Sequence, residues 1–458
     1  MTATQSDKNT DQLQPERYFA PVPDETEAYD LPVTGTLPTE LAGRYFRNGP
    51  NPLPGDPSGH WFTGIGMLHG VRIAGGKAEW YRNRWVKTAR LAGERFMDEN
   101  GRRNLAVNSA NTHIIEHGGK LLALCEVGFP YQVTPELDTV GPVDFGGRLT
   151  TAMTAHPKQD PVTGELHFFG YGFRPPFLTY HRLSASGELV HSAEIDVPAS
   201  TMMHDFAITE NYVIWLDLPL VFDHTLLERG MPYEWRDAYG ARLGVMRKDS
   251  TKVQWFDVDP CYILHVGNAF EDSQGRIVVD AVRYSRRSWD ALWGQIGGAV
   301  EVGNHLVDAA TSLGVSAMHR WTLDPASGTV SEQLVDDRGV EFPTINESRT
   351  GLPNRYVYTV GNGHVGAIVK YDTETGRSWA NELGDRVAGE AVFIPADGGT
   401  NEDDGWLMSI LSERSGKGSQ LVVLDAGDVA AGPVATVELP RRVPAGFHGS
   451  WFADGVTD

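Results

Sequence analysis

The sequence lacks long apolar runs and has few cysteines. No stretch approaches the roughly 20 apolar residues that a membrane-spanning helix needs, and the polar N-terminus lacks the basic and apolar regions of a signal peptide. The two cysteines, Cys125 and Cys261, are too few for a disulfide framework, and both lie in apolar contexts typical of small buried side chains. We therefore expect a cytoplasmic protein and assign neither cysteine a catalytic role.

Positive charge is also scarce. The formal net charge is −21, with 39 Lys and Arg against 60 Asp and Glu. Nucleic acids and anionic lipid surfaces both require clusters of lysine and arginine, so this balance argues against either partner. Any peripheral contact with a membrane would have to use an apolar patch. Nothing in the sequence indicates an obligate protein partner.

The chain shows no break between domains. Between Leu31 and Pro444 there is no Pro/Ser run, no charge block and no low-complexity stretch. Residues 1–15 are polar and lack apolar periodicity, which predicts a flexible N-terminal tail. We expect residues 16–458 to form one large domain.

The pattern of short segments favours an all-β fold. Residues 212–216, 276–280, 355–358 and 421–424 are rich in β-branched or aromatic side chains and are bounded by turn formers. Residues 160–164, 324–328 and 372–376 each begin with Asp and end with Gly, as hairpin turns do. Short strands with many glycine-containing turns indicate a sandwich, a barrel or a propeller.

Four histidines stand in strand-like segments and form a candidate metal-binding set: His156, His204, His265 and His448. Neutral imidazoles suit iron, copper, nickel and zinc. Their spacing matches no local metal motif, and a single buried histidine is more often a core residue hydrogen-bonded to a carbonyl. Taken alone, the residues leave both interpretations open.

Motifs around these histidines carry a resemblance to a known family. Residues 43–52 (GRYFRNGPNP) and 60–70 (HWFTGIGMLHG) resemble the N-terminal signature of the carotenoid cleavage oxygenases. Further similar segments follow in family order, at residues 155–157 (AHP), 203–206 (MHDF), 265–269 (HVGNA), 340–343 (VEFP), 390–395 (EAVFIP), 402–405 (EDDG) and 447–449 (FHG). The resemblance covers nearly the whole chain, from about Glu16 to Trp451.

The resemblance implies a seven-bladed β-propeller, with a few helices and loops capping the face that carries the metal site. It implies that His156, His204, His265 and His448 bind Fe(II). It also implies that three glutamates accept hydrogen bonds from ligand histidines, and the matching positions are Glu126, Glu341 and Glu390. Glu402 is a competitor for the third position, but its Asn-Glu-Asp-Asp-Gly setting is typical of a solvated turn.

The activity implied is the cleavage of one C=C bond by Fe(II) and O2 into two carbonyl products, without an organic cofactor. The substrate would be an apolar small-molecule alkene. Family members that cleave phenolic alkenes resemble one another in a lysine at the position of Cys125, so its absence here favours a carotenoid or apocarotenoid. Cleavage of a stilbene or phenylpropanoid is the alternative.

Aromatic residues near the motifs are candidates for the substrate tunnel: Phe129, Tyr131, Phe173, Phe177, Trp215, Trp289 and Trp293. Equally, such aromatics fill propeller blades. Trp289, Leu292, Trp293 and Ile296 recur with helical spacing, which predicts a helix after the third histidine. We favour a cap helix packed on the propeller over a role at an apolar mouth.

Two other classes of function remain as alternatives. A metal-dependent propeller hydrolase would surround calcium or zinc with carboxylates and amides instead of four histidines. A non-catalytic propeller that binds other proteins would need neither the histidines nor the glutamates.

Overall fold

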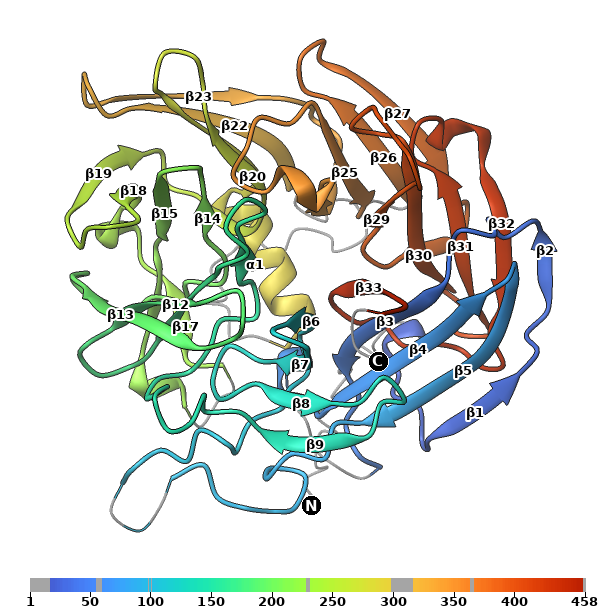
Figure 1. Cartoon of the computed structure of the whole chain (residues 1–458). Coiled ribbons are helices and arrows are strands. Elements are labelled where there is room, and N and C mark those ends of the chain that lie inside the picture. Colours follow the sequence, from blue (N-terminus) through green and yellow to red (C-terminus); the bar gives the residue numbers. More distant parts are fainter. Residues whose placement is uncertain are drawn as a thin grey trace, which may run out of the picture.

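Seven antiparallel sheets stand in a ring around a central axis (Figure 1). The computed structural model describes residues 17–54, 60–97, 99, 101–227, 231–297, 316–362 and 366–455. Each of the seven sheets has four or more strands, and one two-stranded hairpin stands apart from them. This confirms the seven-bladed β-propeller. The expected tail, residues 1–15, lies outside the described residues, and the extent of the domain stays a prediction.

The blades follow one another in chain order, and in blades 2 to 6 the strands run in sequence from the axis outward. Blade 1 contains β33 (Gly449–Ala453), β3 (Gly43–Pro50), β4 (Gly66–Ala74), β5 (Lys77–Trp85) and β1 (Thr26–Tyr29). Blade 2 contains β6 (His113–His117), β7 (Lys120–Leu124), β8 (Tyr131–Val133) and β9 (Thr139–Pro142). Blade 3 contains β10 (Lys158–Gln159), β11 (Leu166–Tyr171), β12 (Leu178–Leu183) and β13 (Leu189–Ile195). Blade 4 contains β14 (Ala207–Ile208), β15 (Tyr212–Asp217), β18 (Ala241–Arg247) and β19 (Val253–Val258).

The remaining blades complete the ring. Blade 5 contains β20 (Tyr262–Glu271), β21 (Ile277–Tyr284), β22 (Ala317–Asp324) and β23 (Thr329–Leu334). Blade 6 contains β24 (Val340–Thr344), β25 (Tyr356–Gly361), β26 (Ala367–Asp372) and β27 (Arg377–Glu382). Blade 7 contains β28 (Arg386–Ala388) and β29 (Val392–Pro395), both paired with β30 (Gly405–Glu413), then β31 (Ser419–Asp425), β32 (Pro433–Glu438) and β2 (Val33–Gly35). The separate hairpin is formed by β16 (Leu220–Phe222) and β17 (Tyr233–Trp235).

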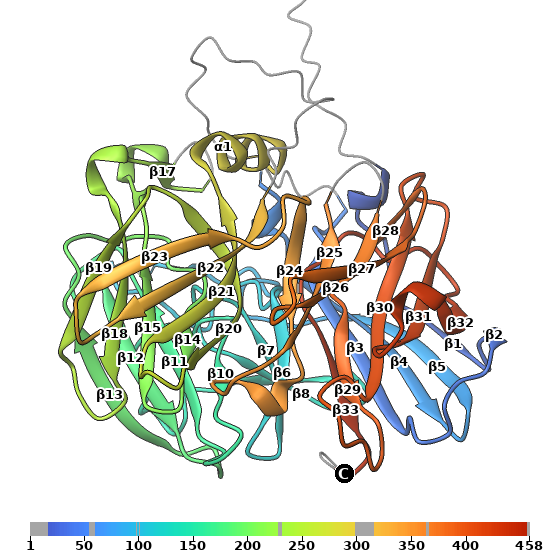
Figure 2. The ribbon, with the colours of Figure 1, turned by 90° about the horizontal axis from the view of Figure 1, so that it is seen from above.

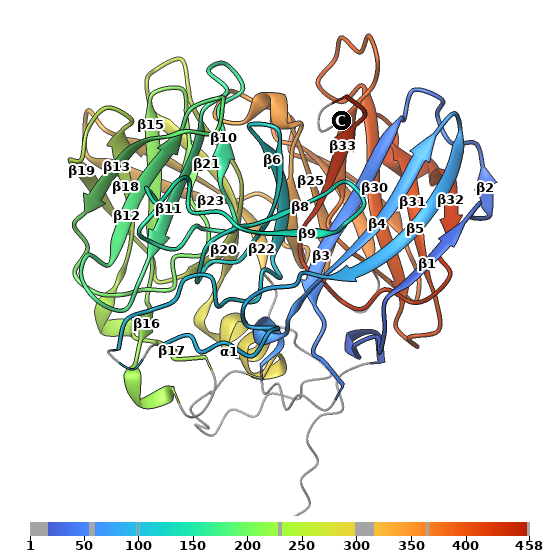
Figure 3. The ribbon, with the colours of Figure 1, turned by 60° about the horizontal axis from the view of Figure 1, so that its bottom comes forward.

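The two ends of the chain close the ring together. The C-terminal strand β33 pairs with β3 of blade 1, and the N-terminal strand β2 pairs with β32 of blade 7. Figure 3 shows the N-terminal strands β1 to β5 beside the C-terminal strands β30 to β33. Because each terminal strand joins a sheet built from the other end of the chain, neither blade can form from adjacent sequence alone.

The turns predicted from sequence are hairpin ends. The turn at 160–164 joins β10 to β11, that at 324–328 joins β22 to β23, and that at 372–376 joins β26 to β27. In the first, Asp160 Oδ1 accepts hydrogen bonds from the backbone N–H groups of Val162 and Thr163, and Gly164 has a φ of 71°. An Asp side chain that caps its own turn and a glycine at positive φ are what this turn requires. The four predicted strand segments lie in β15, β21, β25 and β31.

The α-helix α1 (Arg286–Gln295) lies on one face of the ring, opposite the face at which the chain ends (Figure 2). Its first residue follows Ser285, whose side chain accepts a hydrogen bond from the Ser288 N–H and caps the helix. The other described helices are short 3-10 turns at Arg17–Phe19, Trp61–Thr63, His224–Leu226, Asp237–Tyr239, Glu347–Arg349 and Val429–Ala431. Among the described residues, no helix combines the length and the apolar character needed to cross a bilayer.

Candidate metal centre

The four histidines converge on the axis of the propeller. His156, His204 and His448 lie just before the innermost strands β10, β14 and β33, and His265 lies within β20. One nitrogen from each ring falls within a group whose members are all within 4.8 Å of one another. His204 Nε2 is 3.0 Å from His156 Nε2 and 3.3 Å from His265 Nε2. The wide spacing in sequence thus follows from the fold, because each blade brings its innermost strand to the same axis.

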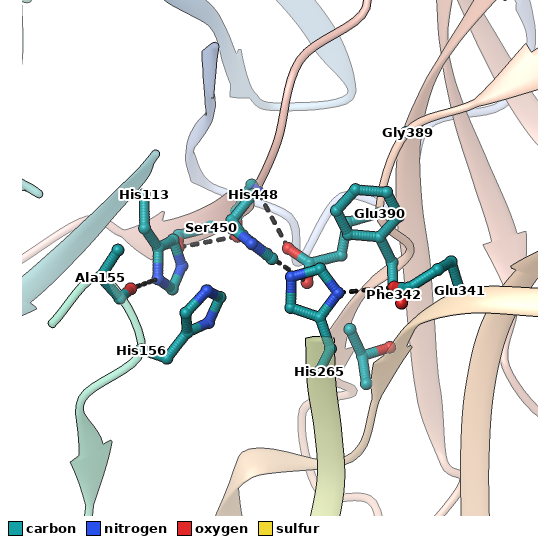
Figure 4. A network of polar contacts seen from close by, with 12 residues as sticks. His113, Ala155, His156, His265, Glu341, Phe342, Gly389, Glu390, His448 and Ser450 are labelled. Atoms are coloured by element: carbon teal, nitrogen blue, oxygen red, sulfur yellow. Dashed lines mark hydrogen bonds and ion pairs between the residues drawn. The ribbon is translucent and has the colours of Figure 1, made fainter. Parts of the chain in front are cut away.

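Three glutamates fix the other ring nitrogens of this set. His265 Nδ1 donates to Glu341 Oε2 at 2.5 Å, and His448 Nδ1 donates to Glu390 Oε1 at 2.9 Å (Figure 4). Glu126 contacts His204 Nδ1. A carboxylate that accepts from Nδ1 leaves the lone pair of Nε2 pointing at the axis, which is the orientation that a metal ligand needs.

The competing carboxylate lies elsewhere. Glu402 accepts hydrogen bonds from the backbone N–H groups of Arg355 and Tyr356 at 2.9 and 2.7 Å. It therefore orders the start of β25 and does not contact a histidine of the set. Glu390 occupies the third carboxylate position beside the histidines.

Each of these glutamates is held in turn by a donor. Tyr171 Oη donates to Glu126 Oε2 at 2.6 Å, and Tyr284 Oη donates to Glu341 Oε1 at 2.9 Å. The Gly449 N–H donates to Glu390 Oε2 at 3.0 Å. Sequence reasoning did not single out either tyrosine, because nothing in one sequence marks a tyrosine on β11 or β21 as facing a glutamate of another blade.

His156 differs from the other three. Within the described ranges, no carboxylate forms an ion pair with it. A fifth histidine, His113, packs beside the set, with its ring centroid 5.1 Å from that of His448. Its Nδ1 contacts the Ala155 carbonyl at 3.0 Å and its Nε2 contacts Ser450 Oγ at 3.2 Å (Figure 4). Because both nitrogens are engaged, His113 supports the segment before His156 and does not act as a further ligand.

Burial sets the charge of the site. It lowers the pKa of His156 and of His265 well below the ordinary value, so both rings are neutral at physiological pH. Burial also opposes the charged form of His204, but the adjacent Glu126 outweighs this effect and raises the pKa of His204. Burial raises the pKa of Glu341 to about 7.

This arrangement fits a bound metal ion. With Nδ1 of His204 and His265 directed at carboxylates, their Nε2 lone pairs face each other across 3.3 Å. Two converging lone pairs repel each other unless a proton or a cation lies between them. Four converging imidazoles, with carboxylates behind three of them, match the preferences of a divalent transition metal.

A cavity of about 330 Å³ opens beside the histidines. His204, His265 and His448 lie on its wall, and so do Leu292 and Gln295 of α1, so the cavity extends from the metal site to the face that the helix covers. Much of the remaining wall is apolar, formed by Phe19, Trp61, Phe62, Leu264, Ile296, Phe342, Val360, Val387 and Phe447. Phe342 stacks on the His265 ring at a centroid distance of 5.0 Å.

None of the seven aromatic residues predicted for the tunnel lies on this wall. Phe129, Phe177, Trp215 and Tyr131 pack in the clusters between blade sheets, and Tyr131 Oη donates to the Ala106 carbonyl at 2.6 Å. Phe173 stacks on Phe222. The role of the seven aromatic residues in the tunnel stays a prediction that the wall of this cavity does not support. For Tyr131 on β8 and Trp215 on β15, the physical reason is that their side chains point into the packed space between blades, away from the axis.

The predicted helix is confirmed, and its two faces differ. Trp289 and Trp293 are buried in the core cluster formed with blades 4 and 5, as expected for a cap helix, and they do not reach the cavity. Leu292 and Ile296, from the same predicted stripe, do line it. Two of the aromatics that line the cavity are neighbours in sequence of site residues, since Phe342 follows Glu341 and Phe447 precedes His448. Their position next to a glutamate or histidine of the metal site was the sequence signal that could have identified these two residues.

The fold and the site define a class of protein: a β-propeller with four histidines at its axis that could hold a metal ion. The family model described as retinal pigment epithelial membrane protein matches residues 19–453. The chain belongs to this family, that of the carotenoid cleavage oxygenases, as the sequence motifs indicated.

Individual relatives agree over nearly their full length. The chain is 40% identical to the carotenoid cleavage oxygenase of Mycobacterium tuberculosis, over 95% of this chain and 96% of that protein. It is 37% identical to a carotenoid 9,10(9',10')-cleavage dioxygenase of Arabidopsis thaliana, over 94% and 88%. Among solved structures, cobalt-substituted apocarotenoid oxygenase of Synechocystis superposes with a TM-score of 0.82 at 28% identity, over 95% and 98%. The lignostilbene dioxygenase of Pseudomonas brassicacearum gives 0.84 at 29% identity, over 96% and 99%.

Proposed function

We propose that this protein is an Fe(II)-dependent dioxygenase that uses O2 to cleave one C=C bond of a carotenoid or apocarotenoid into two carbonyl products. The observation that carries the proposal is the convergence of four histidine nitrogens within 4.8 Å of one another at the axis of the propeller. Ferrous iron held by the four histidines would supply the redox chemistry with O2, and no organic cofactor is required.

The residues around the metal have definable tasks. Glu126, Glu341 and Glu390 hold the tautomer and the orientation of three imidazoles and make them better donors to the metal. Because the ligands are neutral, they leave the positive charge of the ion uncompensated at the point where O2 would bind. The buried carboxylates lie behind the rings, where they balance part of that charge.

The cavity favours a long apolar alkene. Phe62, Phe342 and Phe447 form an apolar wall next to the histidines, which would hold a polyene over the metal and keep water away from it. Similar proteins support this class, since the Synechocystis relative with 30% identity is an apocarotenoid-15,15'-oxygenase. Which double bond is cut would depend on how far the polyene substrate reaches along the cavity.

The alternative substrate is a phenolic alkene. The similar structure of a lignostilbene dioxygenase keeps this alternative in view. Cys125 lies on the cavity wall directly before Glu126, and burial raises the pKa of its thiol. The position therefore offers a neutral side chain where a lysine could bind a phenol oxygen, which favours the polyene. A cytoplasmic location and a peripheral contact with membranes, from which such a substrate would be drawn, stay predictions.

An aerobic incubation of Fe(II)-loaded protein with a panel of carotenoids, apocarotenals, stilbenes and phenylpropanoids tests the proposal. We expect aldehydes or ketones from the polyenes alone, identified by mass spectrometry. Carbonyl products only from the phenolic alkenes would replace the substrate class and keep the chemistry. Retention of zinc or calcium in place of iron, with hydrolytic products, would overturn the proposal. His224, whose side chain is 84% exposed, supplies a control: His224→Ala should behave like the wild type.

A further inference from the structure

One cation lies deep on the wall of the metal-site cavity. Arg47 of β3 is only 3% exposed, and it lines the same cavity as His204, His265 and His448. Its Cα pairs with that of Gly449 across β3 and β33, one residue beyond His448. The guanidinium therefore enters the cavity close to the point where blade 1 delivers its histidine.

Arg47 has no carboxylate partner among the described residues. Its Nη2 donates to the Pro444 carbonyl, and its Nε has no hydrogen-bond partner. Two other arginines of this blade behave differently: Arg44 forms ion pairs with Glu136 and Asp454, and Arg72 forms ion pairs with Glu79 and Asp454. Arg44 and Arg72 thus form ion pairs with acidic side chains, whereas the buried Arg47 has no anion beside it among the described residues.

Two glycines make room for the guanidinium. A Cβ added at Gly446 would lie 2.5 Å from Arg47 Nη2, and one at Gly389 would lie 3.4 Å from Nη1. Any side chain at position 446 would therefore displace the guanidinium. The backbones of the segment before His448 and of the segment before Glu390 enclose it from two sides, which fixes its position on the wall.

Burial lowers the pKa of Arg47 to about 10, which leaves the side chain cationic at neutral pH. An uncompensated charge in a buried site is costly unless an anion or several acceptors meet it. The bond to Pro444 occupies one of five guanidinium N–H groups. If Arg47 served only to bind the Pro444 carbonyl, a neutral donor would be enough, and no charge would have to be buried in a cavity with apolar walls.

We propose that Arg47 binds the carbonyl or carboxylate oxygen at one end of the substrate, so that the enzyme prefers a polyene with an oxidised end to a hydrocarbon of equal length. This rests on the proposed function and narrows its substrate to the apocarotenoid type. A guanidinium donates and cannot accept, so it selects acceptor oxygens, while the apolar wall receives the chain. One charged contact at a fixed distance from the metal also sets which double bond lies beside it.

The test compares two polyenes of equal length, one ending in a carboxylate and one in a methyl group. For the wild-type Fe(II) enzyme we expect kcat/KM to be at least about tenfold higher for the acid. Arg47→Met should lower kcat/KM for the acid by about 10- to 100-fold, mainly through KM, and leave the value for the methyl-ended polyene within about threefold. Arg47→Lys should restore part of the preference. Arg44→Met, on the same strand but outside the cavity, is the matched control and should keep the wild-type ratio.

Other outcomes separate the possible failures. Equal losses for both polyenes in Arg47→Met, with iron content and thermal stability unchanged, would show that Arg47 only shapes the site and would overturn the proposal. If Arg47→Met does not fold, the wild type alone decides: equal kcat/KM for the two polyenes also overturns it. If the wild type cleaves neither polyene, the proposed function fails. Binding of the two polyenes, followed by quenching of tryptophan fluorescence, then still tests Arg47, because tighter binding of the acid supports the role and equal binding contradicts it.

Discussion

The molecule contains two populations of buried histidine, one at the axis and one within the blades. In the blades, His69 Nδ1 lies 2.8 Å from Tyr81 Oη, and His167 Nδ1 lies 2.6 Å from Tyr180 Oη. His181 contacts Thr151 Oγ1 and Ser192 Oγ, both at 2.8 Å. At the axis, in contrast, Nδ1 faces a carboxylate in three of four rings, and Nε2 faces other imidazoles.

Burial does not distinguish these populations, because both are almost completely enclosed. The partners of the ring nitrogens do. In these three blade histidines Nδ1 meets a hydroxyl, which can both donate and accept, so that nitrogen needs no cation. An axis histidine has one nitrogen fixed as a donor and the other aimed at further lone pairs, so it is satisfied only by a cation. The difference separates structural from metal-binding histidines without reference to burial or to spacing in the sequence.

The seven blades divide the work of the site between them. His448, His156, His204 and His265 come from blades 1, 3, 4 and 5, and Glu126, Glu341 and Glu390 come from blades 2, 6 and 7. Each blade thus delivers one polar residue of this set. With four ligands and three carboxylates, one histidine has no carboxylate of its own, and that one is His156.

The largest effect should come from removing one axis histidine. His204→Ala removes a ligand that lies next to two others, so we expect at least about a 100-fold loss of metal affinity and no detectable turnover. His181→Ala, in a blade, should keep the metal and lower the free energy of unfolding by about 2 kcal/mol, because it removes a buried ring and its contacts with Thr151 Oγ1 and Ser192 Oγ. Metal content after dialysis and denaturant unfolding measure the two quantities. Loss of metal in both variants would contradict the division of the buried histidines into metal-binding and structural populations.

The next largest effect concerns the carboxylates. Glu390→Ala removes the acceptor of His448 Nδ1, and we expect metal affinity to fall by about 10- to 100-fold. Glu402→Ala removes a carboxylate that binds only backbone N–H groups of β25, so it should cost about 1–2 kcal/mol of stability and leave metal affinity unchanged. Competition with a chelator gives the affinities. Equal metal affinities in the two variants would show that Glu390 does not tune its histidine.

Sequence alone identified the axis residues because each lies inside a motif of several residues. AHP, MHDF, HVGNA and FHG mark the histidines, and the family order of these motifs implied the propeller. Periodicity found strands and hairpin turns but could not count blades, because the closure of the ring depends on pairing β33 with β3 and β2 with β32. Those pairings join opposite ends of the chain and leave no local signal.

The cavity wall could not be predicted in the same way. The sequence pattern of a strand shows which residues share a face, but it does not show which face packs against a neighbouring blade. Trp215 and Tyr131 are aromatic residues near the motifs, yet they fill the contacts between blades. Tyr284 and Arg47 are functional candidates that sequence reasoning did not single out, although Arg47 lies within the motif at residues 43–52. Their roles depend on Glu341 and Gly446, which come from distant parts of the chain.

The blade histidines should make stability depend on pH. Burial lowers the pKa of His167 to about 3, well below its unfolded value of 6.5. Its contribution to stability is therefore complete above pH 6.5 and is lost as the pH falls toward the folded-state pKa. Each such histidine adds a slope of about 1.4 kcal/mol per pH unit in that range. Denaturant unfolding of metal-free protein between pH 8 and 5 measures how the free energy of unfolding changes with pH. This change should be smaller in His167→Gln than in the wild type. Equal changes would show that His167 does not contribute to the pH dependence.

The smallest effects should come from two tyrosines. One supports an axis histidine and the other contacts a blade histidine, so their variants form a matched pair. Tyr284→Phe removes the donor to Glu341 Oε1, so the carboxylate holds His265 less firmly, and metal affinity should fall by about fivefold with little change in stability. Tyr180→Phe removes the partner of His167 Nδ1, and it should cost about 1 kcal/mol of unfolding free energy while metal affinity stays at the wild-type value. Because both changes delete one buried hydroxyl, their volume effects cancel in the comparison. An equal shift of metal affinity in both variants would mean that the tyrosines act through general packing and not through the nitrogens they orient.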